Sequence, residues 1–207
     1  MEDRRTLVLF DFDGTITHRD TLLAFTRFAV GWARYGRGLV YLALPLVLQK
    51  IKVLSSHRAK QIFLTHFFKG WRFPDFEEHC LRFSDDILPG LVRDEALEAI
   101  KSYVKRGNRT IIVSASPQNW ILPWATRWGV EVIATQLEVK EDRLTGRIAG
   151  QNCNGKEKVN RIRQHVNLKE YTEIIVYGDT GGDRAMLGLA TQGYYKPFRS
   201  NSVKGNR

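Results

Sequence analysis

Short apolar runs alternate along the chain with segments of helical periodicity. The first run, Leu7 to Phe10, lies between charged residues and an Asp-Gly turn, as is typical of a buried parallel strand. The same pattern predicts three further strands, over 110–113, 130–134 and 174–177. Helical spacing predicts the segments between and after them, over 95–104, 118–125, 157–166 and 183–189. This alternation predicts an α/β fold, a doubly wound parallel sheet with helices on both faces.

Two segments depart from this alternation. From Asp20 to Asp86 the pattern is helical throughout, and Pro45 predicts a kink or an end of a helix within the apolar run Leu39 to Leu48. That run falls well short of the ~20 residues that a membrane span requires. Leu137 to Val139 and Leu144 to Ile148 flank Glu141-Asp142, which predicts a hairpin.

These patterns divide the chain into three parts. We predict a core domain over 1–17 and 88–198 and a helical cap over 18–87, inserted after the first strand. The polar residues 199–207 are expected to form a flexible basic tail.

Composition excludes several classes of protein. With 43% hydrophobic and 26% charged residues in 207, the chain is neither disordered nor collagen-like. Cys80 and Cys153 lie far apart and belong to no Cys/His cluster, which argues against a disulfide framework or a zinc module and suits a reducing cytoplasm. We expect no signal peptide, because the charged start leads directly into a short apolar run followed by acidic residues.

Nearly the whole excess of the formal net charge of +10 belongs to one segment within the predicted cap. No acidic residue occurs between Asp20 and Asp75, and nine cations do: Arg27, Arg34, Arg37, Lys50, Lys52, Arg58, Lys60, Lys69 and Arg72. Aromatic residues are interleaved with them. The segment therefore fits either a solvated helical insertion with its own small core or a basic, apolar surface that rests on an anionic membrane. Nucleic acid is not expected as a partner, because no recognised nucleic-acid-binding motif accompanies the cations.

Carboxylates follow two predicted strands at the point where each strand ends. Asp11 and Asp13 come after the first strand, and Asp179 and Asp183 after the strand 174–177. Because the carboxyl ends of parallel strands meet at one edge of a sheet, Asp11, Asp13 and Asp179 are expected to cluster around one ion. Like-charge repulsion opposes such a cluster unless a cation lies within it, and oxygen ligands of this kind suit Mg²⁺. The sequence thus predicts a magnesium site.

Four short motifs occur in order along the chain: Asp11-Phe12-Asp13-Gly14-Thr15, a hydrophobic strand ending in Ser114, a lysine within 156–158, and Gly178-Asp179-x-x-x-Asp183. In order and spacing they resemble the motifs of the haloacid dehalogenase (HAD) superfamily. The resemblance covers most of the chain outside 20–86. It implies a HAD-type, Rossmann-like core with a helical cap, and an enzyme.

The resemblance also implies roles for the carboxylates. Asp11 would be the nucleophile that forms an aspartyl-phosphate, and Asp13 would protonate the leaving oxygen and then activate water. An acid at the position of Asp13 distinguishes the phosphatases of the family from the dehalogenases. Mg²⁺ would be bound by the Asp11 carboxylate, the Asp13 backbone carbonyl and Asp179, with Asp183 in or near the second layer of residues, behind these ligands.

Phosphate binding would fall to a serine and a lysine. Ser114 would donate its hydroxyl to a phosphoryl oxygen, and a lysine would offset the gathered negative charge. Lys156 and Lys158 both qualify by position. The pattern Gly155-Lys156-Glu157-Lys158-Val159 resembles that of the phosphoserine-phosphatase-like branch (subfamily IB), which favours Lys158.

The same branch suggests two substrate-binding residues. Phosphoserine phosphatases carry a Glu shortly after the first motif and an Arg in the cap, and Asp20 and Arg58 are the corresponding candidates. Each also has a simpler interpretation, Asp20 as a helix cap and Arg58 as a surface cation. Asp in place of Glu departs from the pattern and weakens the case for phosphoserine as the substrate.

Three functions follow as alternatives. The cationic, apolar cap resembles in composition that of phosphatidylglycerophosphatase C enzymes of this branch, which implies a phospholipid head-group phosphate as substrate and peripheral contact with the inner face of the membrane. A cytoplasmic phosphatase of phosphoserine or another small phosphomonoester is the second alternative. A non-catalytic basic binding protein on the same scaffold is the third.

Overall fold

Alternating side chains of one central strand build two apolar layers in the computed structural model, which describes residues 5–51 and 53–199. Val8 and Phe10 point into one layer, and Leu7 and Leu9 point into the other. Because neighbouring side chains of a strand face opposite sides of the sheet, this fully apolar strand must be covered on both faces.

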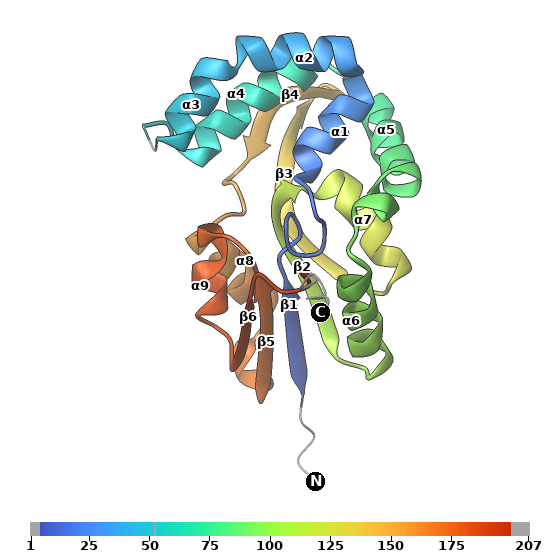
Figure 1. Ribbon diagram of the computed structural model, residues 1–207, viewed down its shortest axis with the longest axis vertical. Coiled ribbons are helices and arrows are strands. Elements are labelled where there is room, and N and C mark those ends of the chain that lie inside the picture. The colour runs from blue at the N-terminus through green and yellow to red at the C-terminus, as the bar shows by residue number, and fades with distance from the viewer. Residues whose placement is uncertain (1–4, 52, 200–207) are drawn as a thin grey trace, which may run out of the picture.

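The sheet has six strands in the order β4-β3-β2-β1-β5-β6 (Figure 1). The strands are β1 (Thr6–Phe10), β2 (Arg109–Pro117), β3 (Glu131–Lys140), β4 (Arg143–Ala149), β5 (Glu173–Gly178) and β6 (Gln192–Tyr195). All neighbours are parallel except β3 and β4. This confirms the predicted α/β fold with a doubly wound parallel sheet.

Helices cover both faces of this sheet. The core helices are α6 (Asp94–Lys105), α7 (Gln118–Arg127), α8 (Lys156–His165) and α9 (Arg184–Leu187), with short 3-10 turns at η1 (Leu88–Leu91), η2 (Leu168–Glu170) and η3 (Gly181–Asp183). Ile100 of α6 and Ile121 of α7 pack in the layer of Phe10, whereas Ile162 of α8 and Met186 of α9 pack in the opposite layer.

Five helices follow β1 and lie over the carboxyl ends of the strands (Figure 1). They are α1 (Thr21–Val30), α2 (Trp32–Tyr41), α3 (Ala43–Lys50), α4 (Ser56–Phe68) and α5 (Phe73–Asp86). Pro45 interrupts no helix, because α3 begins at Ala43 and a first-turn residue needs no backbone N–H. The break falls instead at Leu42, between α2 and α3.

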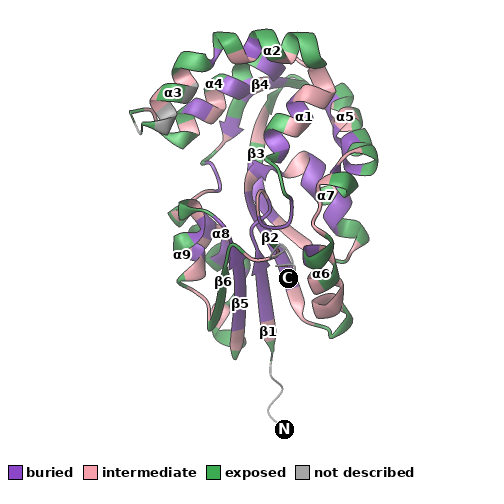
Figure 2. Ribbon diagram, in the orientation of Figure 1, coloured by how far each residue is buried: buried purple, intermediate pink, exposed green. Residues whose placement is uncertain are grey.

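The buried phenylalanines of these helices pack into the core rather than forming a separate cluster. Phe25 of α1 stacks on Trp120 of α7, with ring centroids 4.5 Å apart, and meets Phe83 of α5 edge-on at 5.5 Å. The inward-facing parts of α1, α5 and α7 are buried together (Figure 2). This packing fixes α1 and α5 above the ends of the strands.

The predicted hairpin is formed by β3 and β4, and its turn residues Glu141 and Asp142 have positive φ angles of 48° and 58°. It lies against α4, where the Thr65 hydroxyl donates to the Gly146 carbonyl at 3.1 Å. The hairpin, assigned by sequence to the core, thus packs with the cap helices. In addition, β6 was not predicted, because Gln-Gly-Tyr-Tyr has no apolar alternation and every residue of this edge strand is exposed.

The first residue of the predicted flexible tail, Arg199, contacts the core. Arg199 forms an ion pair with Asp179, at 3.2 Å between Nη2 and Oδ2. Residues 200–207 lie outside the described residues. Across the ranges that the structure describes, no helix combines the length and the apolar character of a membrane span.

Candidate active site

Three carboxylates from two strand ends meet at the carboxyl edge of the sheet. Asp11 follows β1, and Asp179 and Asp183 follow β5. One oxygen of each lies within 4.8 Å of one oxygen of the others, and all three residues are buried. Because β1 and β5 are adjacent and parallel, their ends bring these residues together. The sequence predicted Asp13 as the third carboxylate of the cluster, but the structure has Asp183 in that place.

Lys158, near the start of α8, joins two of these carboxylates. Its Nζ donates to Asp11 Oδ1 at 2.6 Å, to Asp183 Oδ1 at 2.7 Å and to the Val113 carbonyl at 2.7 Å. The side chain is only 1% exposed, whereas Lys156 is exposed to solvent. Of the two lysines that the sequence left open, only Lys158 reaches the cluster.

The cluster shifts the pKa of each of its members. Burial by itself would lower the pKa of Lys158, but the Asp11 and Asp183 carboxylates raise it above its usual value, so the ammonium form is held. Burial raises the pKa of Asp11 to about 7, with Lys158 opposing that rise. The pKa of Asp183 is lowered despite burial, because Lys158 and the Thr180 N–H and hydroxyl donate to it.

The arrangement around Asp179 fits a divalent cation. Its Oδ1 is buried and has no hydrogen-bond partner among the described residues, so a buried acceptor is left unsatisfied. Gly14, with φ of +86°, passes so close that a Cβ there would lie 2.3 Å from Asp179 Oδ2. Because Gly14 has no side chain, the space beside Asp179 stays open. The three convergent carboxylates line this space with oxygen atoms, which suits Mg²⁺ or a similar hard ion.

The Asp13 carboxylate is turned away from this cluster, toward the start of α1. Its Oδ1 accepts from the Thr21 N–H at 2.7 Å and from the Thr21 hydroxyl at 2.6 Å. Its Oδ2 accepts only a long bond, 3.4 Å, from the hydroxyl of the buried Ser114. One oxygen is therefore held in place, and the other is left available for proton exchange.

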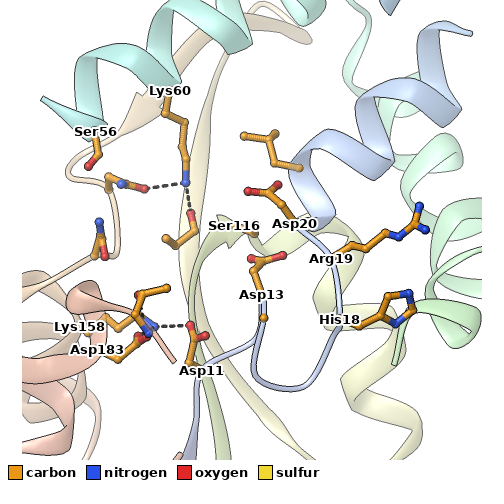
Figure 3. A pocket seen from close by; sticks show the side chains of 16 residues that line it. Asp11, Asp13, His18, Arg19, Asp20, Ser56, Lys60, Ser116, Lys158 and Asp183 are labelled. Carbon is orange, nitrogen blue, oxygen red and sulfur yellow. Dashed lines mark hydrogen bonds and ion pairs between the residues drawn. The ribbon is translucent and has the colours of Figure 1, made fainter. Parts of the chain in front are cut away.

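A pocket of about 480 Å³ opens between these carboxylates and the helices above them (Figure 3). Asp11, Asp13, Lys158 and Asp183 line its floor, and Asp20 lies at its side. Asp20 also accepts the Leu23 N–H at 3.0 Å as the N-cap of α1. Both interpretations of Asp20, as a helix cap and as a pocket residue, thus hold together.

The structure does not bring Arg58 to this pocket. Arg58 lines a separate hollow on the other side of α4, beside Glu138 and Arg147. Lys60 of the same helix points down into the pocket instead (Figure 3). The reason is helical geometry, because residues two positions apart in an α-helix project about 200° from one another.

Lys60 is the main pocket residue that the sequence did not identify. Its Nζ donates to the Ala115 carbonyl at 2.7 Å and to Asn152 Oδ1 at 3.1 Å, and so links α4 to the core. Both acceptors are neutral, and no described carboxylate lies within 4.0 Å of this ammonium. Burial lowers the pKa of Lys60, and the negative charges of Asp13 and Asp20 oppose this only in part.

Other supporting residues carried a weaker sequence signal. Thr15, whose hydroxyl donates to Asp11 Oδ2 at 3.0 Å, belongs to the Asp-Gly-Thr motif. Ser116, in the pocket wall, is two residues beyond the predicted strand-end serine. Nothing in the local sequence marks Thr21 or Asn152, because each acts through a partner from a distant segment.

Comparison with known proteins places this geometry in a family. Protein CicA of Caulobacter vibrioides is 33% identical over 195 residues, which cover 93% of this chain and 86% of that protein. The probable phosphatase Rv3661 of Mycobacterium tuberculosis strain H37Rv is 28% identical over 202 residues, covering 88% of this chain and 66% of the relative.

Solved structures share the fold. A protein of unknown function from Bordetella pertussis Tohama I superposes with a TM-score of 0.78 at 23% identity, over 92% of this chain and 89% of that chain. A phosphoserine phosphatase, solved as a phospho-aspartyl intermediate analogue, gives 0.67 at 18% identity, over 92% and 86%. At these identities the likeness shows the fold alone.

A family model matches as well, over most of the chain and across all four motifs. It describes haloacid dehalogenase-like hydrolases and spans residues 8–188, from β1 to the end of α9. The three carboxylates and the buried lysine all lie within this match. The chain therefore belongs to the haloacid dehalogenase-like hydrolases.

Proposed function

We propose that the protein is a Mg²⁺-dependent phosphomonoester hydrolase in which Asp11 is phosphorylated during turnover. The observation that carries this proposal is the contact of the buried Lys158 with both Asp11 and Asp183, beside Asp179. Burying several charged groups together lowers the free energy of unfolding. Clusters of this kind are therefore typical of functional sites. The alternative of a non-catalytic basic binding protein leaves this cluster without a role.

The metal would be bound by the carboxylates of Asp11, Asp179 and Asp183, with the backbone carbonyl of Asp13 as a further ligand. When bound, it supplies positive charge that offsets the phosphoryl oxygens. Lys158 also offsets the negative charge of the phosphoryl oxygens, because its ammonium stays charged beside Asp11. Ser116 of the pocket lining offers a hydroxyl donor to the phosphoryl group. Ser114, the donor that the sequence predicted, is buried outside this lining, and its hydroxyl donates to Asp13.

The reaction would run in two steps on this chain's own residues. In the first, a carboxylate oxygen of Asp11 bonds to phosphorus as the ester P–O bond breaks, and Asp13 gives its proton to the leaving oxygen. In the second, Asp13 takes a proton from water, which bonds to phosphorus and releases Asp11. The Thr21 contacts hold Asp13 Oδ1 and leave Oδ2 to carry the proton.

We further propose a membrane phospholipid head-group phosphate, such as phosphatidylglycerophosphate, as the substrate. Lys60 supports this choice, because its hydrogen bonds go to neutral acceptors and its ammonium faces the pocket, where it can bind a second anionic group, such as the phosphodiester of that lipid. The acid-free stretch of the cap between Asp20 and Asp75 supports contact of a cytoplasmic protein with the inner face of a membrane. A small phosphomonoester such as phosphoserine is the second candidate, since Asp20 stands in the pocket and could bind an amine.

A substrate panel tests this choice. With Mg²⁺ present, we expect kcat/KM for phosphatidylglycerophosphate in mixed micelles to exceed that for phosphoserine by at least about tenfold. Chelation with EDTA should abolish both activities, and added Mg²⁺ should restore them. A higher kcat/KM for phosphoserine would favour the second candidate, and no metal-dependent hydrolysis of any ester would exclude the enzyme altogether.

The Lys60→Met variant tests the second anion. It keeps the length of the side chain but removes the charge, so we expect KM for a substrate with two anionic groups to rise about tenfold or more. Hydrolysis of p-nitrophenyl phosphate, which has one anionic group, should change much less. Lys69→Met is the matched control, because Lys69 is an exposed cap cation outside the pocket. An equal loss on both substrates would contradict a second anion subsite.

A further inference from the structure

Exposed aliphatic and aromatic side chains gather at one end of the cap. We call them the α2–α3 face, and they are Val40 (79% exposed), Tyr41 (75%), Leu44 (67%), Val47 (55%), Ile51 (61%) and Val53 (71%). Within α3 and just beyond it, Leu44, Val47 and Ile51 follow a spacing of three and four residues, so they share one side of the helix. Six large apolar side chains exposed within residues 40–53 point to an interaction surface.

The charge around this face has one sign. Arg34 and Arg37 of α2 are exposed, and the sequence between Asp20 and Asp75 contains no carboxylate. Elsewhere the surface mixes both signs, as in the ion pairs Arg72–Asp75 and Lys101–Glu98. An apolar face flanked only by cations complements a surface that is apolar inside and anionic outside, which describes a bilayer with acidic lipids.

The α2–α3 face also reaches the edge of the active-site pocket. Ser56, the first residue of α4, lines the pocket, and Val53 precedes it by three residues. Three residues span at most about 11 Å between Cα atoms, so the last apolar side chain of the face lies close to the pocket rim. A surface that met this face would thus lie beside the pocket.

We propose that the α2–α3 face is a membrane-docking surface that inserts into the interface of a bilayer containing anionic phospholipid. This inference rests on the proposed function, and it adds which part of the cap meets the membrane. Docking there presents the pocket to a head group that stays in its own leaflet. The enzyme then need not extract the lipid into water.

The other occupants of such a face fit less well. In a two-fold dimer the face would meet its own copy, which would bring Arg34 and Arg37 toward the same cations of the second chain with no acid to pair with them. Most of the exposed side chains are aliphatic, and these offer neither stacking planes nor hydrogen bonds to nucleic-acid bases.

The Leu44→Asp variant tests the proposal, with Leu81→Asp as its matched control. Leu81 is a half-exposed leucine of α5 outside the face, so both variants undergo the same chemical change and gain the same charge. Wild type and control should sediment with vesicles of phosphatidylglycerol and phosphatidylcholine. Leu44→Asp should bind them at least tenfold more weakly, because it loses apolar contact and adds repulsion. Neither residue lines the pocket, so p-nitrophenyl phosphate hydrolysis should match wild type in both.

Two groups of outcomes separate this proposal from the proposed function. Docking is overturned if wild type stays in solution with these vesicles at low salt, if Leu44→Asp binds as well as the control, or if ultracentrifugation shows a dimer that Leu44→Asp alone dissociates. In each case phosphatase activity in solution still stands. Vesicle binding that Leu44→Asp alone weakens supports docking, even if no phosphomonoester is hydrolysed and the proposed function fails.

Discussion

Replacing Asp11 by asparagine should lower kcat for any phosphomonoester by on the order of 10⁴-fold or more. An amide does not attack phosphorus to form an acyl phosphate, and the change also removes one of the three convergent carboxylates. The fold should persist, because burial already disfavours the charged form of Asp11, whose pKa is raised to about 7. Intact-protein mass spectrometry of rapidly quenched reactions should show an added phosphoryl group on wild type and none on the variant.

The control for this variant is Asp75→Asn. Asp75 is an exposed carboxylate of α5 that pairs at 3.8 Å with Arg72, so its loss should leave kcat within about twofold of wild type. If Asp11→Asn instead keeps activity within tenfold of wild type, another residue must be the nucleophile. The role assigned to Asp11 would then be wrong even if the metal site is real.

Replacing Lys158 by methionine should damage both stability and turnover. The side chain keeps its length, but Asp11 and Asp183 lose the ammonium that lies 2.6 and 2.7 Å from them. Breaking a buried ion pair in this way costs about 3–5 kcal/mol of the free energy of unfolding, measured by urea denaturation of the metal-free protein. Hydrolysis should fall by about 10²–10³-fold, because the phosphoryl group then meets uncompensated negative charge.

Lys156→Met is the natural comparison, since it makes the same change two residues earlier in the same helix at an exposed position. Its free energy of unfolding should differ from wild type by less than about 0.5 kcal/mol, and its kcat should be unchanged. Equal behaviour of the two variants would show that the lysine contacts of the cluster contribute nothing measurable. Both the pairing and its part in catalysis would then be rejected.

Most of the architecture could be predicted because it depends on local patterns. Leu7 to Phe10 is apolar on both faces, which is typical of a strand covered on both sides. Because such strands alternate with amphipathic helices along the chain, the pattern predicts a parallel sheet. The failures occurred where tertiary contacts outweigh the local pattern. The strand β6 pairs with β5 without an apolar signal, and the hairpin of β3 and β4 packs against α4 although it continues a core strand.

The site divides in the same way. Strand-end positions predicted a cluster of Asp11, Asp13 and Asp179, because the ends of parallel strands meet at one edge of the sheet. The structure brings Asp11 and Asp179 together, but the third carboxylate within 4.8 Å is that of Asp183. The cap residue that enters the pocket could not be predicted from strand-end positions. Arg58 and Lys60 are similar in charge and close in sequence, and only the rotation of α4 about its axis decides which one enters the pocket.

By itself, the sequence determined the fold class, the order of the motifs and the position of carboxylates at the strand ends, since periodicity and strand-end position act through short-range geometry. Only the tertiary structure decided which lysine is buried against Asp11, that Asp13 turns to Thr21, and that Lys60 rather than Arg58 faces the pocket. Each of these depends on the orientation of one helix against another segment. That orientation is set by packing across the whole core, which no local stretch of sequence encodes.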